Sequence, residues 1–333
     1  MQTRTYGELF KLISALCGTG QQLTVPEQDQ LRQFINRRFQ EAFDTSPVWP
    51  RYFVTSEERR IIALTIENAA GTGASDINGD YYLLGTQKSG ASSHAKVGSN
   101  IYSKTTNSDD GSVVDGTIVF EKFATGNQWQ INTNSSVDRS SDGSIDLATV
   151  GTIRYREDST IDHTSAPYEV TVWGTVNSAS GRPTVLQKQA IPYTENNRNN
   201  IGDFHRIHRK TPFINNSSIE YDFSVDIDGA NILNISNTED SSAYVTYKRE
   251  FTPYTITSGY YDSALEVPQE FYNFIAHTAF ADFLRMQGKN EQALAEEQVG
   301  NIFLAQELEK IDIRSNNNTV NKRFSTYVSR QSR

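Results

Sequence analysis

The chain has 333 residues, of which 11% are aromatic, and it carries a formal net charge of -9 with a single cysteine, Cys17. Its length exceeds what one hydrophobic core usually organises and its aromatic content argues against disorder, so we expect two or three folded domains. The acidic balance excludes a general attraction to nucleic acid or anionic lipid, and one cysteine excludes an internal disulfide and a cysteine-based metal site.

Two amphipathic helices are predicted at the N-terminal end, in residues 1–60. Thr5 and Glu8 form a capping box that begins the first helix, and Thr24 and Glu27 form the capping box of the second. One face of the second helix is lined by Leu31, Phe34, Ile35, Arg38 and Ala42. The apolar run of the first helix does not fit a signal peptide, and no run approaches the roughly 18–20 residues of a membrane helix. We therefore expect a soluble protein made in a cytosol, with no membrane partner.

The pattern then changes to short β-prone pieces joined by Gly, Ser, Asn and Asp. Such turn-rich connections are typical of an antiparallel sandwich or barrel. We expect residues 61–186 to form an inserted β-rich domain and residues 187–264 to form a β segment that completes the helical body. The expected strands are Ile61–Ile66, Tyr81–Leu84, Thr117–Phe123, Trp129–Ile131, Thr152–Arg156, Tyr168–Trp173, Phe204–Ile207, Ile219–Ile227, Ile232–Ile235 and Ala243–Arg249, with a hairpin turn at Asp226–Gly229.

Two more helices are predicted in residues 265–312. Pro268 suits the first turn of one helix, Gly288 ends it, and Asn290 caps the next. One face of the first comprises Phe271, Phe274, Ile275, Thr278 and Asp282, and the inner positions of the second comprise Ala293, Ile302, Phe303, Leu308 and Ile311. Because half a helix pair cannot bury its apolar stripe alone, the two chain ends should pack together. The expected class is α+β, a helical bundle of both ends with a β-rich segment and an inserted antiparallel β-sandwich or barrel-like domain.

Residues 313–333 are predicted to form an extended basic tail. No acidic residue follows Asp312, and a segment rich in Asn and Ser would not pack as a core. It is either a frayed end or a docking strand that orders on a partner. The residues expected to dock are Arg314, Lys322, Arg323, Phe324, Tyr327, Arg330 and Arg333.

Two patterns resemble metal-ligand sets. His205 and His208 are three residues apart on a predicted strand, so they point to opposite faces, and the neighbouring arginines oppose a cation. Asp76, Asn78 and Asp80 offer oxygens at alternate positions, as calcium loops do, but they lack the downstream bidentate glutamate and are typical of a β-turn. Asp109-Asp110-Gly111 and Asp226–Gly229 are weaker examples of the same pattern. We expect no metal at these positions.

Trp129 and Trp173 either form a sugar-stacking platform on the β domain or belong to its core, which is the commoner use of aromatic residues on short strands. The sequence contains no nucleophile elbow, no zinc-hydrolase helix motif and no cysteine–histidine couple of suitable spacing. We therefore expect neither enzymatic activity nor a cofactor.

Several motifs at the two ends occur in a characteristic order. They are Leu31–Phe39, Ser46–Tyr52, Val267-Pro268 followed by Phe271, Ala279–Leu284, Gly288-Lys289, Ala293–Glu297 and Phe324–Tyr327. In this order they resemble the head-to-tail adaptor (neck) proteins of tailed bacteriophages. Ile201–Tyr254 shows a weaker likeness, and Ile66–Val185 resembles β-rich modules of phage neck and tail proteins.

The resemblance implies a virion structural protein of the neck between capsid and tail, assembled in the host cytoplasm. It implies a ring, typically twelvefold, beneath the portal protein, with genomic DNA passing non-specifically through the centre. The C-terminal segment would reach the portal, and tail nozzle or tube proteins would bind the opposite face, with tail fibres as possible partners of the insertion. Since a ring needs heterologous contacts, Phe280, Phe283 and Leu284 are expected to lie at subunit interfaces. The alternative is a β-sandwich binding module for glycans or tail fibres.

Overall fold

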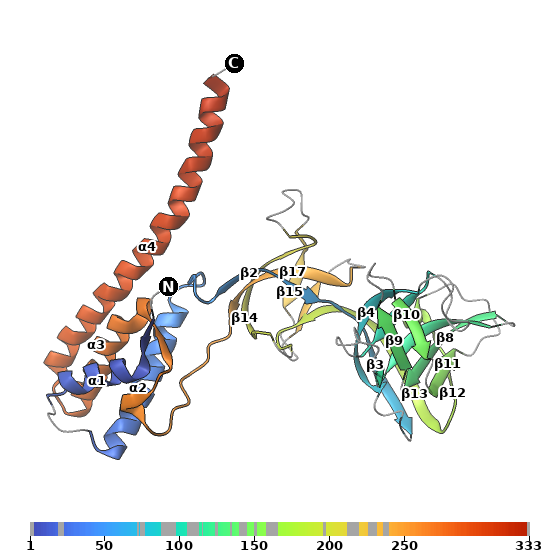
Figure 1. The fold of residues 1–333 in the computed structure, drawn as a ribbon, viewed down its shortest axis with the longest axis horizontal. Helices are drawn as coiled ribbons and strands as arrows, with labels where there is room; N and C mark the ends of the chain where they lie inside the picture. Colours follow the sequence, from blue (N-terminus) through green and yellow to red (C-terminus); the bar gives the residue numbers. More distant parts are fainter. Residues whose placement is uncertain are drawn as a thin grey trace. The chain divides into compact units, whose positions relative to one another are not determined.

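The computed structural model describes residues 3–18, 23–71, 73, 77–87, 98–104, 113–114, 116–123, 126–133, 135–139, 145–149, 152–157, 166–195, 198–211, 220–225, 232–235 and 240–331. For residues 3, 113–114, 119–123, 126–127, 135–139, 145–149, 232 and 312–331 it describes the backbone alone. The chain is mixed α+β and divides into two compact units (Figure 1). Residues 1–53 and 248–333 form the helical unit, and residues 54–247 form the β unit.

The helical unit contains four α-helices and one small sheet in its described residues. The helices are α1 (Tyr6–Leu16), α2 (Val25–Asp44), α3 (Gln269–Met286) and α4 (Asn290–Gln331), with the 3-10 turn η4 at Tyr260–Asp262. The sheet pairs β1 (Thr3–Thr5) with β18 (Glu266–Pro268) and so joins the two chain ends directly. Thr5 and Glu8 form the predicted capping box, with the Glu8 amide donating to Thr5 Oγ1 and the Thr5 amide to Glu8 Oε2.

The core of the helical unit is aromatic and draws on both chain ends. The indole of Trp49 meets Phe271 edge-on with ring centroids 4.7 Å apart, and Phe39 stacks on Tyr254 at 5.1 Å. Such ring pairs contribute beyond the area that they bury. Residues of α1, α2, α3 and α4 belong to this one cluster. The two ends of the chain therefore form one hydrophobic core.

The structure corrects the expectation that Phe280, Phe283 and Leu284 lie at subunit interfaces. Phe280, Phe283 and Leu284 are 9%, 1% and 5% exposed and belong to the unit's own core. The physical reason is that α3 contacts α1, α2 and α4, and a helix that is apolar around its circumference is buried. These three residues therefore offer no surface to a neighbouring subunit.

Helix α4 departs from its predicted pattern in two ways. Ile302, expected on the inner face, is 57% exposed, whereas Leu308 and Ile311 pack against the core. The residues expected as an extended tail continue the helix to Gln331 (Figure 1). No glycine or proline follows Gly300 to stop the helix, and the late basic residues complement the negative end of its dipole.

The β unit contains a ten-stranded sheet in the order β12-β11-β8-β7-β5-β4-β3-β13-β16-β15, a three-stranded sheet β14-β17-β2, and a three-stranded sheet β10-β9-β6. Every described pairing of the ten-stranded sheet is antiparallel. The strands are β2 (Phe53–Arg60), β3 (Ile62–Gly71), β4 (Gly79–Thr86), β5 (Asn100–Ser103), β6 (Val113–Val114), β7 (Thr117–Phe123), β8 (Gly126–Thr133), β9 (Ser135–Arg139), β10 (Ile145–Thr149), β11 (Thr152–Glu157), β12 (Trp173–Thr175), β13 (Ala179–Pro192), β14 (Ile201–His208), β15 (Phe223–Val225), β16 (Ile232–Ile235) and β17 (Ser242–Arg249).

Strand β13 shows that the predicted domain boundary between residues 186 and 187 is wrong. It runs through that boundary, pairs with β3 over its first part and pairs with β16 at its end. The β segment to Tyr247 therefore belongs to the β unit and does not complete the helical body. Tyr168–Trp173 is also not a strand, because its first part is the 3-10 turn η3 (Pro167–Glu169). The turn expected at Asp226–Gly229 lies outside the described residues, although β15 and β16 on either side of it pair antiparallel.

Candidate functional site

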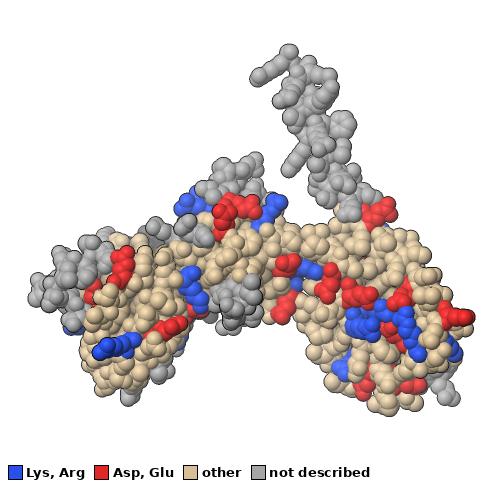
Figure 2. Space-filling model, turned by 180° about the vertical axis from the view of Figure 1, so that it is seen from behind, with Lys and Arg blue, Asp and Glu red and all other residues tan. Residues whose placement is uncertain are grey.

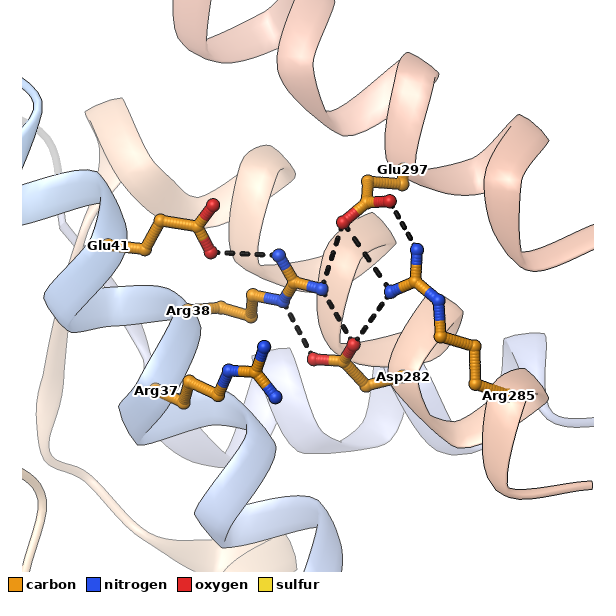
Figure 3. A pocket seen from close by; sticks show the side chains of 6 residues that line it. All are labelled: Arg37, Arg38, Glu41, Asp282, Arg285 and Glu297. Carbon is orange, nitrogen blue, oxygen red and sulfur yellow. Dashed lines mark hydrogen bonds and ion pairs between the residues drawn. The ribbon is translucent and has the colours of Figure 1, made fainter. Parts of the chain in front are cut away.

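Six charged residues of the helical unit line a cavity of about 620 Å³ (Figure 3). They come from α2, α3 and α4, and three are arginines and three are acids, so their formal charges balance. They are Arg37, Arg38, Glu41, Asp282, Arg285 and Glu297. Figure 2 shows basic and acidic side chains gathered together on one face of the helical unit, in place of a patch of one sign.

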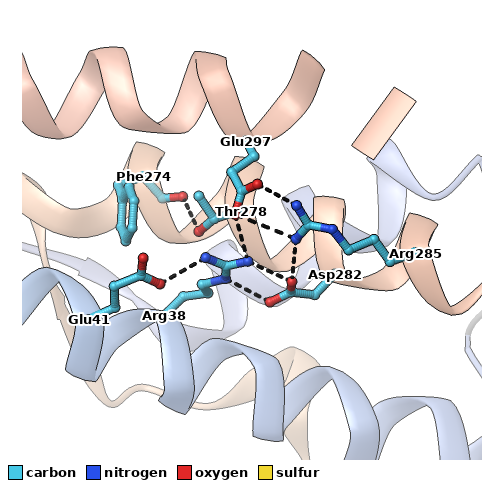
Figure 4. Close-up of polar contacts among 7 residues, drawn as sticks. All are labelled: Arg38, Glu41, Phe274, Thr278, Asp282, Arg285 and Glu297. Carbon is cyan, nitrogen blue, oxygen red and sulfur yellow. Dashed lines mark hydrogen bonds and ion pairs between the residues drawn. The ribbon is translucent and has the colours of Figure 1, made fainter. Parts of the chain in front are cut away.

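Arg38 is the centre of this charged network. Its Nε and one terminal nitrogen donate to the two carboxylate oxygens of Asp282 at 2.7 and 2.6 Å. Its other contacts reach Glu41 at 2.8 Å and Glu297 at 3.0 Å (Figure 4). The side chains of Arg38 and Asp282 are 4% and 6% exposed. The hydrogen bonds to Asp282 raise the pKa of the Arg38 guanidinium above its ordinary value.

A second arginine completes the network from the end of α3. Arg285 donates to Asp282 at 3.0 Å and also pairs with Glu297 of α4. Asp282 therefore accepts from two guanidinium groups, and Glu297 contacts the same two. Removing charges from water is costly unless their hydrogen bonds are replaced, and this geometry replaces them. The network joins α2, from the first part of the chain, to α3 and α4, from the last.

The adjacent Arg37 provides a natural comparison. Its side chain is drawn at the same cavity in Figure 3, but the residue is exposed and has no ion pair within the described part of the chain. Because a solvated arginine contributes little to stability, Arg37 and Arg38 should behave very differently when they are replaced.

Glu297 gives the network a pH dependence. The hydrogen bond from Arg285 is the main cause of the lowered pKa of the Glu297 carboxyl, and the charges of Arg285 and Arg38 add to it. A group whose folded pKa lies below its unfolded value, about 4.3 for Glu, contributes stability above that pH and loses it as pH falls through the folded pKa. We expect Glu297→Gln to flatten the loss of helical-unit stability between about pH 5 and pH 3.

Denaturant unfolding followed by helical circular dichroism at several pH values measures this effect. Glu309→Gln, at an exposed position on the same helix, is the control and should keep the wild-type slope. A wild-type slope in Glu297→Gln would show that this carboxylate is not held by Arg285 in solution.

A buried arginine in the β unit is also fully engaged. Arg59 has a side-chain exposure of 0% and donates to the Asn199 carbonyl at 2.6 Å and to the Tyr247 hydroxyl at 2.9 Å. Its remaining nitrogens reach Glu57 at 2.8 Å and Glu195 at 3.2 Å. Like Arg38, it has a structural role, because its hydrogen bonds join residues that are far apart in the sequence.

The residues that resemble metal ligands have other roles in the structure. The Asn78 side chain makes two hydrogen bonds to the backbone of Ala69, at 2.9 and 2.8 Å, and Asp80 pairs with Lys188 at 2.8 Å. Asp76 and Asp109-Asp110-Gly111 lie outside the described residues. His208 lies in β14, where its backbone forms an isolated antiparallel β-bridge with Glu220. Across the described ranges no three His, Cys, Asp or Glu side chains are placed to hold a metal ion.

The two tryptophans of the β unit are buried, and Cys17 of the helical unit is half-buried. Trp129 and Trp173 belong to the core of the β unit, so a sugar-stacking platform on these two rings is wrong. Burial raises the pKa of the Cys17 thiol to about 11, and the charge of Glu27 adds to the shift. A thiol with such a pKa is protonated at neutral pH and is a poor nucleophile.

The chain has no match among family models, curated proteins or solved structures. No described helix is long and apolar enough to cross a membrane. The charged network is therefore interpreted from its own geometry, in which paired side chains tie helices together. Of the residues expected to dock on a partner, Arg314, Lys322, Arg323, Phe324, Tyr327 and Arg330 belong to α4, where the structure describes the backbone alone, and Arg333 lies outside the described residues.

Proposed function

We propose that this chain is a head-to-tail adaptor of a tailed-phage virion, a non-enzymatic protein that forms a ring between portal and tail. The observation that carries the proposal is the length of α4. It begins at Asn290, packs Leu308 and Ile311 against the core of the helical unit, and continues to Gln331. At a rise of 1.5 Å per residue these last twenty residues span about 30 Å. The Asn- and Ser-rich sequence of this part of the helix suits a partner surface better than the chain's own core.

The charges of α4 support the same interpretation. The first part, up to Asp312, carries six acidic residues and one lysine, whereas residues 313–333 carry five basic residues and no acidic ones. Ile313, Val320, Phe324 and Tyr327 follow each other at spacings of seven, four and three, which is the spacing of one helix face. An apolar stripe flanked by basic residues is suited to a partner groove with an acidic rim.

The composition of this segment supports ordering on a partner. Residues 315–321 are Ser, Asn, Asn, Asn, Thr, Val and Asn, all weaker helix formers than Ala by up to about 0.7 kcal/mol each. Helical structure here needs stabilisation by contacts. A portal surface would supply them in the assembled neck.

The ring contacts of the proposed adaptor require a surface other than α3. Leu294, Val299 and Ile302 of α4 are exposed aliphatic residues, and Val299 and Ile302 lie on the side of the helix opposite to Ala293 and Leu304. We expect this face of α4 to contact a second copy of the chain. The acidic balance of the whole protein suits a ring that must let DNA slide without holding it.

Deleting residues 314–333 tests the docking proposal. We expect attachment to the portal protein of the same virion to fall at least about tenfold, because the helix would lose its apolar stripe and five positive charges. The unfolding midpoint of the helical unit should change little, since a polar segment rich in Asn and Ser would not pack as a core. Co-sedimentation with portal rings measures attachment, and circular dichroism measures folding.

Charge substitutions provide the matched control for this deletion. Lys322→Ala with Arg323→Ala should weaken attachment, whereas Lys289→Ala, at the exposed turn between α3 and α4, should not. Unchanged attachment after the deletion of residues 314–333 would rule out docking through this segment.

The alternative function, a β-sandwich binding module, loses the residues on which it was first based, because Trp129 and Trp173 are buried. A binding role for the β unit therefore requires another surface.

A further inference from the structure

A second cavity, of about 480 Å³, belongs to the β unit alone. Its walls come from β3, β4, β5 and β13 and from the segment that contains η3, and Ile61 and Asp240 also line it. This volume lies within the range of about 300–1,000 Å³ that is typical of small-molecule sites. The proposed adaptor function does not account for it.

Three neighbouring strands change register at this cavity. Ala63 is an extra residue of β3 opposite β4, and Leu84 is an extra residue of β4 opposite β5. On β13, Gln187 pairs with Leu64 and Ala190 pairs with Ile62, so that β13 has one more residue than β3 between these two pairs. Gln189, inside this last bulge, has a φ of 50°, which a residue other than glycine seldom adopts. Bulges redirect side chains and are frequent beside binding sites.

A bend of the sheet explains only part of this pattern. Strands β3 and β13 pass from the core that contains Ile66 and Val185 to the core that contains Ile191, with Ile61 preceding β3. A bend between two cores accounts for their bulges. The described residues of β4 contribute to the first core only, and β4 nevertheless changes register beside the same cavity. The three bulges together therefore shape the cavity.

The polar side chains that line the cavity are mostly neutral. Asn100, Gln187 and Thr86 are exposed at its wall, and Tyr168 is 38% exposed there. No lysine or arginine occurs among its described lining residues, and the carboxylate of Asp240 pairs with Arg209, which is not one of them, at 2.8 Å. Phosphate, sulfate and carboxylate groups are usually held by arginine or lysine, so an anionic ligand does not suit this lining.

Amide side chains suit hydroxyl groups. Each amide offers two donors and one acceptor oxygen, and each sugar hydroxyl both donates and accepts. A tyrosine ring adds an apolar face with a polar tip, which matches the mixed surface of a sugar ring. The lining therefore combines two exposed amides, those of Asn100 and Gln187, with an exposed threonine hydroxyl and an accessible tyrosine ring around one cavity.

We propose that this cavity binds a neutral carbohydrate, one or two sugar units of a larger glycan. Tyr168 supplies the apolar face, and Asn100 and Gln187 hydrogen-bond the hydroxyl groups. The site depends on the β unit and not on ring formation or portal docking. Its failure would leave the adaptor proposal intact, and the reverse also holds.

The test uses the full-length chain and a panel of immobilised oligosaccharides of glucose, galactose, mannose, rhamnose and N-acetylglucosamine, with sulfated and phosphorylated counterparts. We expect binding to at least one neutral member. Titration calorimetry with the soluble sugar should then show affinity reduced at least about tenfold in Tyr168→Ala and in Gln187→Ala. Both side chains are exposed, so both variants should fold.

Val172→Ala is the matched control, because Val172 follows η3 in the same segment, is 57% exposed and does not line the cavity. It should bind like the wild type. The proposal is overturned by absence of binding across the neutral panel, by a preference for the charged counterparts, or by equal affinity of Tyr168→Ala, Gln187→Ala and the wild type.

Discussion

Replacing Arg38 with methionine is expected to destabilise the helical unit by about 3 kcal/mol, the lower part of the 3–5 kcal/mol range for breaking a buried ion pair. The loss arises because Asp282 would remain buried without its bidentate partner. The lower part of the range applies because Arg285 still donates to Asp282 at 3.0 Å. Denaturant unfolding followed by helical circular dichroism measures the change, since the described α-helices all belong to this unit.

Two further variants distinguish the loss of the buried ion pair from the loss of an arginine side chain as such. Arg37→Met changes the neighbouring exposed arginine and should alter the free energy of unfolding by less than about 0.5 kcal/mol. The double variant Arg38→Met with Asp282→Leu removes both buried charges and leaves the pair of Arg285 with Glu297. It should be more stable than Arg38→Met alone, because no uncompensated charge remains. Equal effects of Arg37→Met and Arg38→Met would contradict a buried network.

Excising the β unit is the second large change, and the helical unit is expected to fold without it. The two cut ends meet inside the helical unit, where the Arg249 amide donates to the Tyr52 carbonyl at 2.9 Å. Lys248 also donates to the Phe43 carbonyl, near the end of α2, at 2.7 Å. A short Gly-Ser linker in place of residues 54–247 therefore closes a short loop at small entropic cost.

Trp49 reports the outcome of this excision. It becomes the one tryptophan of the shortened chain, because Trp129 and Trp173 are removed. It is buried against Phe271 in the native unit. We expect blue-shifted Trp49 emission and a cooperative loss of helical circular dichroism in denaturant. Solvent-exposed emission with weak helical signal would show that the two chain ends need the β unit in order to fold.

The features of the helical unit that could be predicted are those set by residues close together in the sequence. The first capping box and the stop at Gly288, which has a φ of 79°, are encoded by neighbouring residues, and both occur as predicted. Arg38 and Asp282 were each visible as charges on an otherwise apolar helix face. Their pairing was not predicted, because it depends on how helices far apart in sequence meet.

Other features required information that local patterns lack. Strand β2 contains four consecutive charged residues, Glu57 to Arg60, so its sequence does not alternate like a strand. Strand β13 is recognised only through its partners β3 and β16. Phe280, Phe283 and Leu284 of α3 were expected to be exposed but are buried, because burial depends on how many helices surround α3. The end of α4 was misjudged because Asn and Ser lower helix propensity without preventing a helix.

The central proposal is that this chain is a ring-forming adaptor that attaches to a portal. Native mass spectrometry of the full-length chain, alone and mixed with portal rings of the same virion, tests it most directly. The account predicts a complex in which many copies join one portal ring, and a ring of this chain in negative-stain images of that complex. A chain that stays monomeric in the presence of the portal would contradict it.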